Sequence, residues 1–202
     1  MRSPILRVLF SVLFLVAVFG CAQVIQLPPD APSCDAPCLT ARGWGAYEGG
    51  QWGQVGFFFQ AIDLDSSFAE AYMGLGYLHI EQGLVSEASI EFQTAIDLDT
   101  SLVAAFAGNA YCLAAVRDDV SAIGMALIAI DKGGPDFQFV HNPLITTRNL
   151  RLLLAGIYFR NQDYIAAQDQ IDLLVPDNTL SPGSREYVTE LLQLIESLAE
   201  TG

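Results

Sequence analysis

An all-α solenoid built from repeated helix pairs is the fold class that this sequence predicts. The segment FFFQAIDLD, which ends at Asp65, returns as EFQTAIDLD, which ends at Asp99. An offset of about 34 residues places Phe58 on Phe92 and aligns the small apolar residues of both copies. A fixed period of this length indicates stacked helix-turn-helix units, because each unit buries its apolar face against its neighbours.

The first unit is expected over about residues 35–68. Its first helix, near residues 37–48, contains two glycines, and each weakens a helix interior by roughly 1 kcal/mol relative to alanine. This helix therefore depends on packing against the rest of the fold. A Gly-Gly pair follows as the turn, and apolar residues at helical spacing predict a second helix over residues 52–64.

The second unit, residues 69–102, carries the fullest repeat pattern. Its first helix has two large residues and then a small one at the repeat positions, and a glycine makes the turn. On its second helix, small residues flank one phenylalanine. These positions are Tyr72, Leu75, Gly76, Gly83, Ala88, Phe92 and Ala95. The pattern and its spacing resemble the tetratricopeptide repeat (TPR), and the resemblance covers about residues 35–175. It implies a concave groove lined by the first helix of each pair, and it is specific for fold rather than function.

The third unit, residues 103–134, is a drifted copy. The triplet Arg-Asp-Asp at 117–119 replaces the glycine turn, and Asp119 or Ser121 is expected to cap the second helix. The sequence Gly-Gly-Pro at 133–135 then ends that helix.

An apolar insert breaks the period at residues 135–147. It is about ten residues too long for a TPR turn, and a long loop in a compact domain is either functional or packed down. Because exposed apolar patches are rare in monomers, we favour packing of the insert over the solenoid.

A divergent fourth unit is expected at residues 148–176, followed by a last helix over residues 184–199. The last helix has one apolar stripe and a polar opposite side. A solenoid exposes the face of its final repeat, so we interpret this helix as the cap of a domain over residues 35–200.

The N-terminus has the features of an export signal. Two arginines precede a short apolar run within residues 1–20, and the run is shorter than a membrane span of about 20 residues. A retained membrane anchor is the alternative interpretation. The sequence Val18-Phe19-Gly20-Cys21 resembles the bacterial lipobox. The resemblance implies a signal peptide removed before Cys21, acyl chains such as palmitate on that cysteine, and a lipoprotein anchored in the cell envelope. Ala22 in place of aspartate resembles the sequence of lipoproteins sorted to the outer membrane.

Residues 21–34 are expected to form a flexible, proline-rich spacer between this anchor and the repeats.

The charge of the chain excludes some partners. Removal of residues 1–20 takes away two of nine basic residues and no acid, which leaves a net charge of −16. Such a field disfavours nucleic acid and anionic lipid surfaces, because neither supplies positive charge. It is compatible with a basic partner or with a role in solubility alone.

The remaining cysteines predict structural roles. Cys34 and Cys38 stand four apart at the start of the first helix, where an oxidising periplasm would allow a disulfide. Cys112 lies among alanine and leucine and is expected in the core. Neither histidine has a second ligand at helical spacing, so no metal site is predicted.

No active-site motif is present, so we expect neither catalysis, nor a cofactor, nor a small-molecule substrate. The acidic Asp-Leu-Asp endings at 63–65 and 97–99 are expected to close repeats rather than to form a site. The TPR register instead places Tyr47, Met73, Tyr77, Ile80 and Tyr111 in the concave groove. Aromatic and apolar side chains there suit an extended peptide or an amphipathic helix.

Two hypotheses follow from this groove. If it is open, the protein is a membrane-anchored periplasmic scaffold that binds other envelope proteins or peptides during complex assembly. If the insert or the last helix fills it, the protein is an accessory subunit that localises a secreted enzyme or transport complex.

Overall fold

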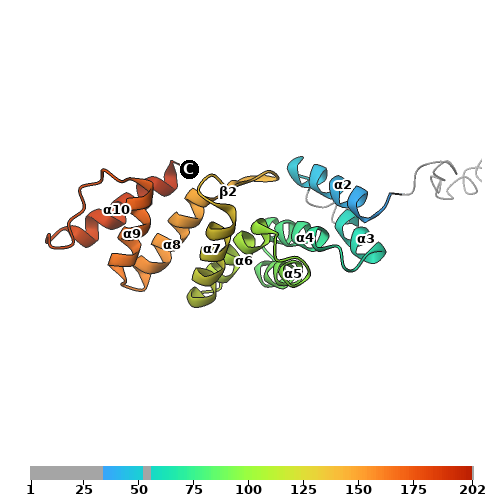
Figure 1. The fold of residues 1–202 in the computed structure, drawn as a ribbon, viewed down its shortest axis with the longest axis horizontal. Coiled ribbons are helices and arrows are strands. Elements are labelled where there is room, and N and C mark those ends of the chain that lie inside the picture. Colours follow the sequence, from blue (N-terminus) through green and yellow to red (C-terminus); the bar gives the residue numbers. More distant parts are fainter. Residues whose placement is uncertain (1–33, 52–55, 202) are drawn as a thin grey trace, which may run out of the picture. The chain divides into compact units, whose positions relative to one another are not determined.

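The computed structural model describes residues 34–51 and 56–201, and its helices follow one another as in Figure 1. Residues 1–33, with the predicted signal peptide, the Cys21 lipid site and most of the spacer, lie outside the described part. The elements are α2 (Ala36–Glu48), α3 (Gly56–Leu64), α4 (Ala69–Glu81), α5 (Val85–Leu98), α6 (Val103–Ala115), α7 (Asp119–Gly133), β1 (Gln138–Phe139), β2 (Asn142–Thr146), α8 (Thr147–Arg160), α9 (Tyr164–Leu174) and α10 (Tyr187–Glu200).

Helices pack in sequence-adjacent pairs, and each pair packs on the next. The pairs are α2 with α3, α4 with α5, α6 with α7, and α8 with α9, while α10 packs on both α8 and α9. Leu191 and Tyr187 of α10 are buried against Ala155 and Ile171 of the last pair. The predicted all-α solenoid with a closing helix is thereby confirmed.

Phenylalanine rings on second helices fill the space between pairs. A Cβ atom added at Gly74 of α4 would lie 2.2 Å from the Phe58 ring, and one added at Gly108 of α6 would lie 2.4 Å from the Phe92 ring. Both rings are fully buried. The glycines on first helices therefore admit these rings, since any side chain would collide with them.

First helices end in left-handed turns at equivalent positions. Gly83 has φ +75°, Arg117 has φ +67°, and Gln162 has φ +64°. The second position follows the first by the repeat period, and the third follows 45 residues later because the insert intervenes. The glycine turn of the second unit thus keeps its backbone geometry where a side chain has replaced glycine.

The insert forms a short antiparallel hairpin, which sequence reasoning did not predict. In this hairpin Gln138 pairs with Thr146 and Phe139 pairs with Asn142. It joins α7 to α8 and reaches back to the end of α2, far away in sequence (Figure 1).

Two helix starts differ from prediction. Asp118 caps α7, because its carboxylate accepts a hydrogen bond from the backbone N–H of Ser121 at 3.2 Å. The expected cap residue Asp119 is instead the first helical residue. The last helix begins at Tyr187 rather than residue 184, since residues 182–186 form turns and bends after the Ser-Pro-Gly sequence.

Within the described residues, no helix is both long and apolar enough to span a membrane.

Candidate protein-binding groove

The five predicted groove residues lie on the first helices of three successive pairs. Tyr47 belongs to α2, Met73, Tyr77 and Ile80 belong to α4, and Tyr111 belongs to α6. Tyr47, Met73 and Tyr77 are only 7%, 4% and 1% exposed, whereas Ile80 and Tyr111 are half-buried. Their role in binding stays a prediction, but three of the five are covered in this structure.

Aromatic contacts with the hairpin cover the N-terminal part of the groove. Phe139 stacks on Tyr77 with ring centroids 4.9 Å apart and meets Trp44 edge-on at 5.5 Å. The imidazole of His141 lies parallel to the indole of Trp44 at 4.2 Å. The insert therefore packs over the solenoid, as its apolar composition indicated, because these rings bury one another.

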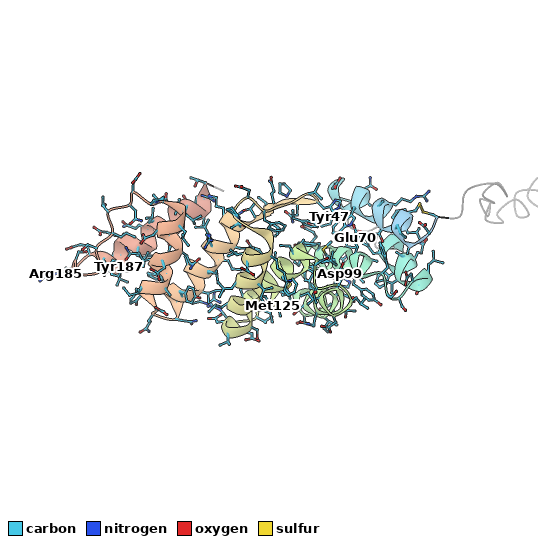
Figure 2. All side chains as sticks on the ribbon, in the orientation of Figure 1. Tyr47, Glu70, Asp99, Met125, Arg185 and Tyr187 are labelled. Atoms are coloured by element: carbon cyan, nitrogen blue, oxygen red, sulfur yellow. A yellow bond between two sulfur atoms is a disulfide. The ribbon has the colours of Figure 1, made fainter. Side chains whose placement is uncertain are left out.

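Polar contacts hold the hairpin at the same place. Asn142 donates a hydrogen bond from Nδ2 to the Tyr47 hydroxyl at 2.9 Å, and this hydroxyl donates to Oε1 of Glu81 at 3.1 Å. Figure 2 labels Tyr47, the residue of α2 that these two hydrogen bonds share. His141 Nδ1 lies 2.6 Å from Oε1 of Glu48. Burial and the charge of Glu81 raise the pKa of Tyr47 well above its ordinary value, so the hydroxyl keeps the proton that it donates.

Tyr77 connects two repeats through its hydroxyl group. Its hydroxyl donates to the backbone oxygen of Ala104 on α6 at 2.7 Å, and burial raises its pKa. The helical register correctly put Tyr77 on the side that faces the hairpin. It gave no information on this long-range contact, because nothing in the local pattern distinguishes a covered tyrosine from an open one.

An open cavity of about 640 Å³ remains beyond the hairpin. It lies between the first helices, strand β2 and the end of α10, and burial raises the pKa of its Tyr111 to about 12. The lining residues are Tyr77, Ile80, Tyr111, Asn142, Leu144, Ile145, Asn149, Leu152, Leu153 and Ala199. The groove is thus filled at its N-terminal part and open further along, so each of the two alternatives describes one part of it.

Sequence reasoning missed the C-terminal wall of this cavity. Leu152 and Leu153 come from α8, and Asn142 and Leu144 come from the hairpin. When the repeat offset is lengthened to 45 residues to allow for the insert, Leu153 aligns with Gly108 of the preceding unit. The sequence could therefore have predicted that Leu153 lies on this wall, had the length of the insert been known.

Cys34 and Cys38 form a disulfide across the first turn of α2. The Asp35 carboxylate accepts from the backbone N–H of Cys38 at 3.0 Å and caps the same turn. These contacts hold the start of a helix that two glycines weaken.

Chemically reactive groups are not gathered in the described ranges. No cluster of three or more histidine, cysteine or acidic side chains within them is placed to hold a metal ion. Burial raises the pKa of the Cys112 thiol to about 12, so it stays protonated. Asp65 and Asp99 accept hydrogen bonds from the backbone N–H groups of Ser67 and Ser101, which fixes the turn after each second helix.

Comparison with known proteins supports the fold. No protein-family model matches the chain, and no curated protein matches its sequence. Among solved structures, YrrB, described as a TPR protein with an unusual peptide-binding site, has a TM-score of 0.64 and 17% identity over 82% of this chain and 87% of its own.

The pilF protein of Pseudomonas aeruginosa has a TM-score of 0.60 and 18% identity over 80% of this chain and 68% of its own. MamA has a TM-score of 0.57 and 17% identity over 82% and 81% of the two chains. At such identities the similarity shows the TPR fold and nothing finer.

Proposed function

We propose that this chain, which has the TPR fold, is a non-catalytic scaffold that binds a segment of another protein in the open cavity. The observation that carries the proposal is the apolar cavity of about 640 Å³ on the side of the first helices. Its volume is in the range of pockets that hold several side chains, and its walls come from three repeats, the hairpin and α10. YrrB, a similar fold, is described as having a peptide-binding site, which supports a peptide ligand here.

The cavity is suited to apolar anchors with few polar contacts. Tyr111 and Leu153 supply apolar surface, while the side-chain amides of Asn142 and Asn149 are the polar groups at its wall. Asn149 already donates to the backbone oxygen of Leu144 at 2.8 Å, so it holds the hairpin against α8. A bound segment would therefore contact a surface that the hairpin has preorganised.

A crosslinking experiment tests this function. Leu144 lines the cavity and is 60% exposed, so a photoreactive residue there meets a bound partner. We expect one dominant foreign protein in the native host, and loss of that crosslink in Ala199→Trp, because the indole would occupy the cavity. Ser197→Trp on the same helix is the matched control, since Ser197 is exposed and does not line the cavity. A crosslink that survives Ala199→Trp would contradict the proposal.

We further propose that the scaffold is anchored through a lipid on Cys21, on the periplasmic face of the bacterial envelope, with the outer membrane favoured. The lipobox resemblance and the proline-rich spacer support this localisation. Mass spectrometry of the mature N-terminus should find an acylated Cys21, and fractionation should find Cys21→Ser released from membranes. An unmodified Cys21 would contradict the anchor and leave the binding function standing.

The second candidate is an accessory subunit that uses another face. The burial of Tyr47 and Tyr77, which both contact the hairpin, favours it, because part of the predicted groove is already occupied. Crosslinks from exposed Val120 of α7, and none from Leu144, would support this alternative.

A further inference from the structure

Acidic side chains strongly outnumber basic ones in the N-terminal part of the solenoid, which contains the covered end of the groove. Between residues 34 and 116, the sequence has ten acidic side chains and a single basic one, Arg42. Two of these acids, Glu48 and Glu81, have exposed side chains and contact the hairpin or the tyrosine that it covers. Glu81 is linked to the cavity wall by two hydrogen bonds, through Tyr47 to Asn142.

The positions of these two glutamates are unfavourable for the helices that carry them. Glu48 is the last residue of α2, and Glu81 is the last residue of α4. A helix C-terminus already carries partial negative charge, so a carboxylate there is repelled where a cation would be stabilised. No lysine or arginine in the described ranges forms an ion pair with either glutamate. The repeated placement therefore creates a negative rim that no lysine or arginine of the described residues neutralises and that helix stability does not explain.

The hairpin itself shows what this rim accepts. It places the imidazole of His141 against Glu48, with Nδ1 2.6 Å from Oε1, beside the Trp44 ring. Where the groove is filled, the chain therefore places a nitrogen donor, His141, between an aromatic ring and a glutamate. Glu81 follows Ile80, which lines the open cavity, and its carboxylate accepts a hydrogen bond from the Tyr47 hydroxyl.

We propose that the occupant of the cavity is a cationic segment of a partner protein, with an apolar side chain between Tyr111 and Leu153 and a neighbouring lysine or arginine against Glu81. This inference rests on the proposed function and adds the charge and orientation of its ligand. Charge complementarity selects this occupant: an acidic segment would be repelled by the rim, and a second copy of a chain with net charge −14 would be repelled as a whole.

The opposite end of the cavity fixes the direction of the segment. Arg148 of α8 donates from Nη2 to the backbone oxygen of Leu198 at 3.0 Å, near the end of α10. Its positive charge lies beside Ala199, which lines the cavity. The basic residue of the ligand is therefore directed toward α4 and away from α8, where it would meet another cation.

A randomised nonapeptide library, applied to the immobilised full chain in detergent, tests this proposal. We expect enrichment of lysine or arginine within a few residues of leucine, isoleucine, phenylalanine or methionine. Enriched peptides should bind about fivefold more weakly to Glu48→Gln/Glu81→Gln, and Glu81→Gln alone should reduce binding in the same direction. The single change leaves the contact between His141 and Glu48 in place.

A control variant separates local from general charge. Asp63→Asn/Glu87→Gln removes the same charge from exposed positions that do not line the cavity. Binding should be nearly unchanged in this control, and equal losses in both double variants would overturn the proposal. Enrichment of neutral or acidic apolar peptides that Ala199→Trp abolishes would overturn the cationic ligand and leave the docking function intact. If the library yields no peptide whose binding depends on the cavity, the cationic ligand and the docking function are both contradicted.

Discussion

The first two junctions between helix pairs differ from the third in which side chain fills the space. At the first two, a phenylalanine of the second helix lies against a glycine of the following first helix, as Phe92 does against Gly108. At the third, the repeat register puts Ala126 in the place of the phenylalanine and Leu153 in the place of the glycine. Large and small residues have exchanged sides, so the volume is supplied from the opposite helix.

This exchange coincides with the open cavity that we propose as the binding site. Leu153 packs against the main core and also lines the open cavity. Gly74 and Gly108, at the equivalent positions of the regular junctions, have no side chain that could do so. The hairpin also enters at the third junction, between α7 and α8. The two regular junctions set the spacing of the solenoid, and the irregular third junction supplies cavity walls.

Removal of the regular junction's ring should have the largest effect. Phe92→Ala leaves a cavity between glycine-bearing helices, and we expect a loss of about 3–5 kcal/mol in the free energy of unfolding, measured with urea. The double variant Phe92→Ala/Gly108→Leu copies the third junction and should recover part of that loss. A double variant less stable than Phe92→Ala would show that the two packings are not interchangeable.

Addition of a single methyl group should have the next largest effect. Gly108→Ala puts a Cβ atom 2.4 Å from the Phe92 ring, so we expect destabilisation by about 2 kcal/mol from overpacking. Gly156→Ala in α8 is the matched control, because a Cβ there has no neighbour within 4 Å. It should stabilise the protein by up to about 1 kcal/mol through helix propensity. Similar thermal shifts for both variants would contradict the tight junction.

The turns that precede the second helices permit a smaller test. Arg117→Gly should raise the unfolding free energy by about 1 kcal/mol, because glycine adopts φ +67° without a steric cost. Gly83→Ala at the equivalent turn should lower it by a similar amount. Calorimetry of the two single variants measures both effects, and shifts of the same sign would be incompatible with equivalent turns.

A pH titration should show the smallest effect, again at the third junction. Arg160 of α8 pairs with Asp119 of α7, with Nε 2.9 Å from Oδ2, and these hydrogen bonds lower the pKa of Asp119 below 3.8. Because the folded pKa is depressed, the stabilisation is present above pH 4 and is lost as the pH falls through the folded pKa. Wild type should exceed Asp119→Asn in stability at pH 7, and the difference should shrink in acid. A difference independent of pH would assign the effect to packing.

Prediction from sequence succeeded where structure depends on local period. The match of Phe58 with Phe92 located helix pairs and the register of Tyr77, and the spacing of Cys34 and Cys38 indicated their disulfide. It missed the hairpin, since five-residue and two-residue strands carry little periodic signal. It also placed Met73 in the groove without deciding whether that part is open or filled, and the structure buries this side chain.

The repeated helix pairs, their turns and the closing helix could be predicted from the amino-acid sequence, because helical periodicity and glycine placement act over a few residues. Which part of the groove is covered and which is open depends on contacts between distant segments. In these contacts Phe139, His141 and Asn142 reach Trp44 and Tyr47, residues more than 90 positions away along the chain. Contacts of such separation form when the repeats between them have stacked, so the local pattern of either segment does not contain them.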